Sequence, residues 1–225
     1  MKPKVELTED LQTLSLHSKA PCVRKFASLI ARDASLLGSL AHLHFQNRPD
    51  TVQQMFGAII SQSSLCASEA QQLGRELDRY FGADYPVPNV VGLILETIVA
   101  QHLSQRLGAG LKRDVKVHIN GRCLEPKNKN LDFGYVDSHD EGGAEFYECK
   151  VTAYDLFEVF DGQLALLTQV NCVLRKMKWD VTCGVPTFIT QNSAEMLFKN
   201  RGVLSWLAPI SYTNLHRLEE GKPPF

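Results

Sequence analysis

The chain is organised around the stretch NLDFGYVDSHDEGGAEFYECKVT, residues 130–152. Residues 131–136 and 144–152 are rich in aromatic and β-branched side chains, whereas residues 138–143 are polar and contain glycine. This pattern predicts a β-hairpin, in which two antiparallel strands are joined by a polar turn. If the turn is centred near Asp140, residues whose numbers add up to about 280 lie opposite one another.

Successive side chains of a strand point to opposite faces, so the hairpin divides its residues into two sets. The set predicted to be apolar contains Leu131, Phe133, Tyr135, Tyr147, Cys149 and Val151. The other face brings Asp132 opposite Glu148 and carries Lys150 as well. One face of an antiparallel hairpin is commonly solvated. These three charged residues therefore either lie on a wet face or form a chemical site.

A further acidic residue, Glu96, lies in a predicted helix before the hairpin. The segment DYPVPN, residues 84–89, contains two prolines that end any preceding helix, and Asn89 is expected to cap a helix at residues 90–108. With about 100° per residue, the neighbours of Glu96 on the helix surface are small or apolar. They are Gly92, Ala100, Leu103 and Leu107. Because a buried carboxylate is costly without a cation, Glu96 either pairs with a basic core residue or faces the hairpin site.

Composition narrows the class of protein. The chain has 225 residues and 44% hydrophobic content, enough for one large domain or for a compact domain with an extension. Its 24 basic and 25 acidic residues nearly cancel, so contact with nucleic acid requires a local basic patch. No segment reaches the roughly 18 apolar residues of a membrane span, and we expect a cytoplasmic protein without membrane contact. The six cysteines lack metal-site spacing and are expected to be reduced thiols.

The order of predicted elements gives two domains. Residues 1–84 are expected to form an N-terminal helical subdomain, with residues 1–19 as a loose arm containing at most one short helix. Residues 89–225 are expected to form an α/β domain, with a central mixed β-sheet flanked by helices. Its elements are the helix at 90–108, a strand at 115–119 followed by a turn at Asn120 and Gly121, the hairpin, a crossover helix from Gln163, a strand at 180–190 broken by Gly184 and Pro186, a helix at 193–200 and an edge strand at 211–218.

With these residues in place, the stretch from about residue 89 to residue 190 resembles the PD-(D/E)XK nuclease superfamily. In that superfamily an acidic residue on a helix precedes a β-meander that carries an Asp and then a (D/E)xK triplet. A helix and another strand follow. By position, Asp132 resembles the aspartate, Glu148 and Lys150 resemble the ExK pair, and Glu96 resembles the helical acid.

The sequence departs from the family motif at one position and leaves another open. Leu131 stands before the aspartate, where the motif has proline. Some members carry a glutamine early in the helix after the triplet. Gln163 is similar to that residue, with Gln169 as the alternative.

The resemblance implies a restriction-endonuclease-like core and a metal-dependent nuclease, most simply an endonuclease. Mg²⁺ or Mn²⁺ would be held by Asp132 and Glu148, with Glu96 as a third or outer ligand and the backbone carbonyl of Cys149 completing the set. Lys150 would orient or activate the attacking water, or stabilise the charged transition state. The alternative is a nuclease-like module that binds nucleic acid or assembles complexes without catalysis.

The expected partner is DNA, although the sequence does not distinguish DNA from RNA. Residues 112–129 contain six basic and two acidic residues, and Arg175, Lys176 and Lys178 form a second basic cluster. Both are candidate phosphate contacts. A homodimer is expected, since two sites related by two-fold symmetry serve the two strands of a duplex. The N-terminal helices also allow a helix-turn-helix interpretation, but they lack the cluster of side chains that base readout requires. A packing or dimerisation subdomain fits them as well, and they are the predicted interface.

Overall fold

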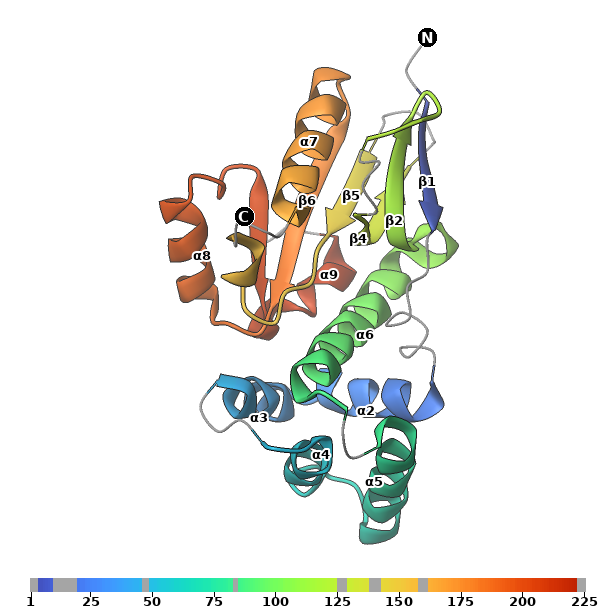
Figure 1. The fold of residues 1–225 in the computed structure, drawn as a ribbon, viewed down its shortest axis with the longest axis vertical. Coiled ribbons are helices and arrows are strands. Elements are labelled where there is room, and N and C mark those ends of the chain that lie inside the picture. Colours follow the sequence, from blue (N-terminus) through green and yellow to red (C-terminus); the bar gives the residue numbers. More distant parts are fainter. Residues whose placement is uncertain are drawn as a thin grey trace. The chain divides into compact units, whose positions relative to one another are not determined.

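The computed structural model describes residues 4–9, 20–45, 49–82, 85–124, 129–137, 143–157 and 162–221. The predicted turn around Asp140 lies outside these residues. The chain divides into two compact units: a helical unit of residues 16–98, and a sheet unit of residues 1–15 together with 99–225 (Figure 1). The boundary between the units falls inside a helix, ten residues beyond the proline segment at which the sequence predicts it.

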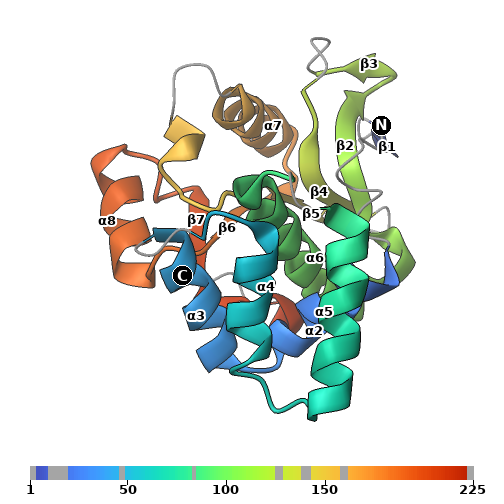
Figure 2. The same ribbon diagram turned by 60° about the horizontal axis from the view of Figure 1, so that its bottom comes forward.

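The described residues of the helical unit form α-helices and their connections (Figure 2). Its helices are α2 (Pro21–Ala31), α3 (Ala34–Phe45), α4 (Val52–Ile60), α5 (Ala67–Phe81) and the first part of α6 (Val87–Leu107). Phe56 lies at its centre, with the ring of Phe26 at 4.9 Å and that of Phe81 at 5.7 Å. Gly82 ends α5 with a φ of 70°, a conformation that glycine adopts without steric cost.

Helix α6 begins at Val87, so the prediction that Asn89 caps it is wrong. The backbone amides of Asn89 and Val90 already donate to the carbonyl of Pro86, at 3.1 and 3.3 Å. Pro88 is accommodated because the first amides of a helix have no partner within the helix. A short 3₁₀ turn, η1 (Gly108–Gly110), follows α6.

Among the described residues, the helix Val87–Gly110 alone is long and apolar enough to cross a membrane by length and composition, although it lacks an unbroken apolar run. Of the 18 residues in its most apolar stretch, 61% are buried inside the fold. The core helix of a soluble protein has these same properties, and this burial fits such a helix.

The sheet unit is built on a mixed sheet, which confirms the predicted α/β class. The described strands are β1 (Val5–Glu9), β2 (Lys112–Ile119), β3 (Arg122–Cys123), β4 (Leu131–Val136), β5 (Gly143–Tyr147), β6 (Asp180–Thr187) and β7 (Leu207–Ser211). Among the described residues these seven strands form one sheet in the order β1-β2-β4-β5-β6-β7, with β3 paired to β2. The pairs from β1 to β5 are antiparallel, and β5, β6 and β7 are parallel (Figure 1).

The N-terminal arm contributes an edge strand to this sheet, where the sequence predicts a loose arm or a short helix. Strand β1 pairs along its length with β2, from Val5 opposite Ile119 to Glu9 opposite Val115. The partner lies more than 100 residues away, so the local sequence VELTE does not reveal the pairing.

The hairpin register is confirmed. Phe133 lies opposite Tyr147 and Val136 opposite Ala144, as a turn centred near residue 140 requires. The second strand is shorter than predicted and ends at Tyr147. To continue the parallel ladder, the amide of residue 186 on β6 would have to donate to the carbonyl of Glu148. Residue 186 is a proline, which has no amide hydrogen, so the ladder is interrupted here.

The C-terminal part differs from the prediction in detail. Strand β6 runs unbroken through Gly184 and Pro186. The edge strand is β7 at residues 207–211, and the residues predicted as a strand form a 3₁₀ turn, η3 (Tyr212–Asn214), and the short helix α9 (Arg217–Glu220). The outer edge of β7 is closed by one side chain of α8 (Gln191–Asn200), because Gln191 donates to the carbonyl of Pro209 and accepts from the amide of Ser211, both at 3.1 Å.

Both faces of the hairpin are covered, so neither is the wet face of an exposed sheet. On one face Phe146 and Ala144 pack in a core with apolar residues of α7 (Gln163–Lys176) and α8. On the other face Glu145 and Tyr147 meet the C-terminal part of α6 through Arg106. The predicted division into an apolar and a polar face is therefore wrong, since each face mixes large apolar and charged side chains.

Candidate functional site

The predicted site begins with a contact between Asp132 and the segment that follows β5. Asp132 Oδ2 accepts a hydrogen bond of 2.6 Å from the backbone amide of Cys149. This bond joins the start of β4 to the end of the hairpin. The carboxylate of Asp132 thus lies beside the residue between Glu148 and Lys150.

Glu148 and Lys150 form an ion pair at the same end of the hairpin. Lys150 Nζ lies 3.2 Å from Glu148 Oε1, and the two side chains are 18% and 3% exposed. A carboxylate this deeply buried is costly unless it is paired, so this is not the solvated face that the sequence left open. The period-two spacing of Glu148 and Lys150 places both side chains on the α7 side of the sheet.

The backbone amides of residues 148–150 point alternately toward β6 and toward Asp132. The amides of Glu148 and Lys150 donate to the carbonyls of Gly184 and Pro186 on β6, at 3.1 and 3.0 Å. The amide of Cys149 points the other way, to Asp132. The amide and carbonyl of one extended residue point to the same side. The carbonyl of Cys149 is therefore expected on the side of Asp132, as the predicted ligand set requires.

Gln163 is the first residue of α7 and is half-buried. A short turn joins the C-terminal end of α7 to the start of β6, so Gln163 at the N-terminal end of α7 lies toward the C-terminal end of β6. The backbone amides of Glu148 and Lys150 bond to β6 at this same end. Gln169 is exposed and donates to the carbonyl of Leu124 at 3.1 Å. The position of Gln163 thus suits the helical glutamine better than that of Gln169.

Glu96 lies in the helical unit and is half-buried. Its neighbours Ala100 and Leu103 are fully buried, as the helical pattern predicts. Thr97, which the pattern places on a more polar sector, is buried as well and donates to the carbonyl of Leu93 at 2.7 Å. Glu96 belongs to the helical unit and the hairpin belongs to the sheet unit. The convergence of Glu96 on the hairpin residues therefore stays a prediction.

The donors near the hairpin end are hard oxygen ligands. In the described part of the chain, no three His, Cys, Asp or Glu side chains are grouped so as to hold a metal ion. Asp132 on β4 and Glu148 directly after β5 are two carboxylates. Mg²⁺ is commonly bound by one or two carboxylates, with water and substrate phosphate as its other ligands. Asp132 and Glu148 are of the ligand type that such an ion takes, and the bound cation stays a prediction.

The predicted basic cluster on α7 does not adjoin this site. Arg175 donates to Asn171 and to the carbonyl of Val181, so it lies at the start of β6, away from the residues that pair with Lys150. Sequence reasoning did not single out Lys129, whose aliphatic carbons lie against Gly162 at the start of α7. Lys129 is thus a basic residue of the 112–129 stretch that lies beside the Gln163 end of the helix.

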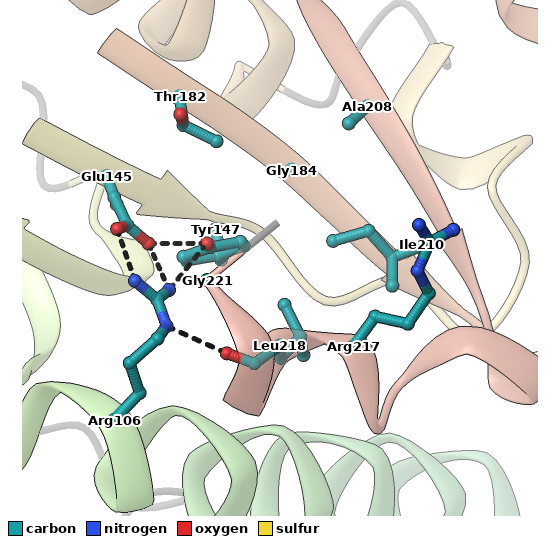
Figure 3. A pocket seen from close by; sticks show the side chains of 10 residues that line it. All are labelled: Arg106, Glu145, Tyr147, Thr182, Gly184, Ala208, Ile210, Arg217, Leu218 and Gly221. Carbon is teal, nitrogen blue, oxygen red and sulfur yellow. Dashed lines mark hydrogen bonds and ion pairs between the residues drawn. The ribbon is translucent and has the colours of Figure 1, made fainter. Parts of the chain in front are cut away.

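The opposite face of the sheet carries a second charged cluster that the sequence did not indicate (Figure 3). Arg106 binds the carboxylate of Glu145 with both terminal nitrogens, at 2.6 and 2.5 Å, and donates through Nε to the carbonyl of Leu218 at 2.8 Å. The Tyr147 hydroxyl donates to the same carboxylate at 2.6 Å.

The titration of this cluster follows from its surroundings. Burial, and then the negative charge of Glu145, raise the pKa of Tyr147 well above its usual range. The hydrogen bonds to Glu145 raise the pKa of Arg106 further. The adjoining cavity measures ≈ 20 Å³, about the space of one water molecule. The cluster therefore fastens α6 and α9 to the sheet.

No protein-family model matches the chain, and no curated protein matches it in sequence.

Proposed function

We propose that the protein is a metal-dependent nuclease that hydrolyses phosphodiester bonds in DNA, most simply as an endonuclease. One observation carries this proposal: Asp132 lies against the backbone of Cys149, while the buried Glu148 is paired with Lys150 at 3.2 Å. Two carboxylates and an ammonium group, on β4 and on the segment that follows β5, are the groups that metal-assisted hydrolysis of a phosphodiester uses.

The order of elements also supports the proposal. Helix α6 precedes the antiparallel meander β2-β4-β5, and α7 and β6 follow. This is the order that the resemblance to the PD-(D/E)XK superfamily implies, and we propose a restriction-endonuclease-like core on that basis. The aspartate lies on the second strand of the meander, and the ExK pair lies at the end of the third.

The proposed cation is Mg²⁺, with Mn²⁺ as a substitute. Asp132, Glu148 and the carbonyl of Cys149 would hold it, with Glu96 as the helical acid. When bound, such a cation neutralises the negative charge that develops on the phosphate during hydrolysis.

The chain's own groups would orient the reactants. Lys150 is held by Glu148 and donates hydrogen bonds, so it is suited to position the attacking water and to stabilise negative charge on a phosphate oxygen. Gln163 would add an amide contact from the start of α7. A homodimer would provide one such site for each strand of a duplex.

A cleavage assay tests the proposal. Supercoiled, linear and single-stranded DNA would be incubated with the purified protein in Mg²⁺, in Mn²⁺ and in EDTA. We expect metal-dependent cleavage that falls at least about 100-fold in Asp132→Asn, Glu148→Gln and Lys150→Ala, since each removes a group that acts in the reaction. The exposed residues Asp180 and Lys199 provide matched controls, and Asp180→Asn and Lys199→Ala should cleave normally.

The outcome also separates the proposal from its alternative. A binding or assembly module without catalysis would retain DNA in EDTA and in Asp132→Asn, and would cleave none of the three substrates. Equal cleavage by Lys150→Ala and the parent would remove the role assigned to the ExK pair.

A further inference from the structure

A strongly exposed tyrosine lies on the segment that leaves the proposed site. Tyr154 is 58% exposed, whereas Ala153 and Leu156 beside it are fully buried. As a whole residue it is more exposed than Phe45 (45%) or Tyr80 (40%), the other strongly exposed aromatic residues of the described chain. The buried neighbours anchor the segment, and Tyr154 alone turns outward from it.

The backbone of Tyr154 is fixed on both sides. Its amide donates to Thr152 Oγ1 at 3.2 Å, and its carbonyl accepts from the amide of Phe157 at 2.9 Å. The second bond closes the 3₁₀ turn η2 (Asp155–Phe157). Tyr154 is thus presented to solvent from an ordered turn, which lowers the entropy cost of a contact with its ring.

A positive charge lies over the same turn. The guanidinium of Arg201 lies 5.5 Å from the ring centroid of Phe157, and this ring packs edge-on against Phe198 at 5.3 Å. Arg201 is exposed, so its donors can reach a ligand while the guanidinium rests on the ring. The Tyr154 carbonyl accepts from the amide of Phe157, so the exposed Tyr154 and the guanidinium over Phe157 belong to the same turn. Exposed aromatic rings and basic side chains together bind single-stranded nucleic acid through base stacking and phosphate contact.

We propose that Tyr154 stacks on an unpaired base of the DNA substrate and that Arg201 contacts a phosphate of the same strand. This inference rests on the proposed DNA substrate. Tyr154 follows Lys150 by four residues, so their Cα atoms are at most about 14 Å apart. That is the length of about four stacked nucleotides, at roughly 3.4 Å each. The stacked base therefore lies within a few nucleotides of the cleaved bond, and the protein prefers DNA that is single-stranded there.

Fluorescence anisotropy in EDTA measures this contact without cleavage. The probes are a fluorescein-labelled 12-nucleotide oligothymidylate and a labelled duplex of the same length at low salt. Tyr154→Ala should weaken binding of the single strand by about 5- to 150-fold, the range for loss of one stacked base. Tyr154→Phe keeps the ring and should bind within about threefold of the parent. Duplex binding should stay unchanged in both variants.

Met196, which is 65% exposed on α8, provides the control, and Met196→Ala should bind both probes like the parent. Equal single-strand affinity for Tyr154→Ala and the parent overturns the inference, as does an equal loss for both probes or a parent without single-strand affinity. A parent that cleaves duplex DNA but fails this test leaves the proposed nuclease intact. A parent that passes it without cleaving any DNA form keeps the stacking contact and refutes the nuclease.

Discussion

Asp132, Glu148 and Lys150 show how far single residues can be predicted from a sequence. The two-residue period of a strand and the centre of the turn are enough to place Asp132 beside the Glu148–Lys150 pair. The burial of Glu148 could not be predicted in the same way, because it depends on β6 and α7, which come later in the chain. The Arg106–Glu145 pair also escaped prediction, since 39 residues separate its partners and no local period connects them.

The Arg106–Glu145 pair should contribute strongly to stability. Its side chains are each 20% exposed, and Arg106→Met leaves the Glu145 carboxylate with the Tyr147 hydroxyl as its remaining partner. We expect the free energy of unfolding to fall by about 3–5 kcal/mol in urea denaturation, as when one member of a buried pair is removed. The exposed pair of Lys4 and Glu6 is the control, and Lys4→Met should cost less than about 1 kcal/mol. Similar small losses in both variants would contradict the fastening role of Arg106.

Burial should also decide which thiols react. The six cysteines are free, and desolvation raises the pKa of Cys183 from 9.0 to about 12, whereas Cys66 and Cys172 are exposed. At pH 8, iodoacetamide followed by mass spectrometry should modify Cys66 and Cys172 first and leave Cys183 unmodified in the folded protein. Modification of Cys183 at the rate of Cys172 would show that β6 opens readily.

The raised pKa of Cys183 also determines the direction in which stability changes with pH. The folded protein keeps the Cys183 thiol protonated up to about pH 12, whereas the unfolded chain loses this proton near pH 9.0. The stabilisation is therefore complete below pH 9 and is lost as the pH rises toward 12.

At the scale of elements, patterns with a short period were predicted well and pairings over a long distance were not. The register of β4 with β5 follows from local spacing. Strand β1 was missed because its partner β2 lies more than 100 residues away. The end of β5 was misplaced because it depends on Pro186 in a neighbouring strand rather than on the hairpin itself.

Close packing of β6 against the Tyr147 ring makes Gly184 a sensitive position. A Cβ at Gly184 would lie 2.8 Å from two ring carbons of Tyr147 and 2.9 Å from Ile210 Cδ1. Gly184→Ala should therefore lower the free energy of unfolding by about 1–3 kcal/mol in urea denaturation. Gly57 lies on the exposed side of α4 with no atom within 4 Å of such a Cβ, and Gly57→Ala should raise stability by about 0.5–1 kcal/mol. Equal stability of the two variants would show that the sheet adjusts to the added methyl group.

At the scale of the whole molecule, α6 belongs to both compact units. The sequence places a boundary at the proline segment near residue 85, whereas the change of unit falls between Ile98 and Val99. The proline pattern marks the end of one helix correctly. The prolines do not show that the first part of α6 belongs to the same unit as α5. The unit to which a helix belongs depends on the side chains that the helix contacts.

Two truncated chains should distinguish these boundaries. A fragment of residues 85–225 retains the first half of α6, with apolar residues such as Leu93 and Ile94 that are buried in the whole chain, and it lacks β1. We expect this fragment to bind a hydrophobic dye such as ANS and to aggregate. Residues 1–15 joined by a flexible linker to residues 99–225 should remain monomeric with little dye binding. The reverse ranking in size-exclusion chromatography would place the boundary at the prolines.

The closed edge of β7 limits how this protein can associate with copies of itself. An open strand edge is a template on which another chain can add a strand, and long apolar edges of this kind lead to fibres. On β7, Gln191 occupies the outward hydrogen-bonding groups of Pro209 and Ser211, and the proline ring offers no donor of its own. Growth of the described sheet by strand addition is thereby directed to β1 at the other end, where Glu6 and Glu9 are paired with Lys4 and Lys112. One end of the described sheet is thus protected against polymerisation, because a side chain occupies its hydrogen-bonding groups.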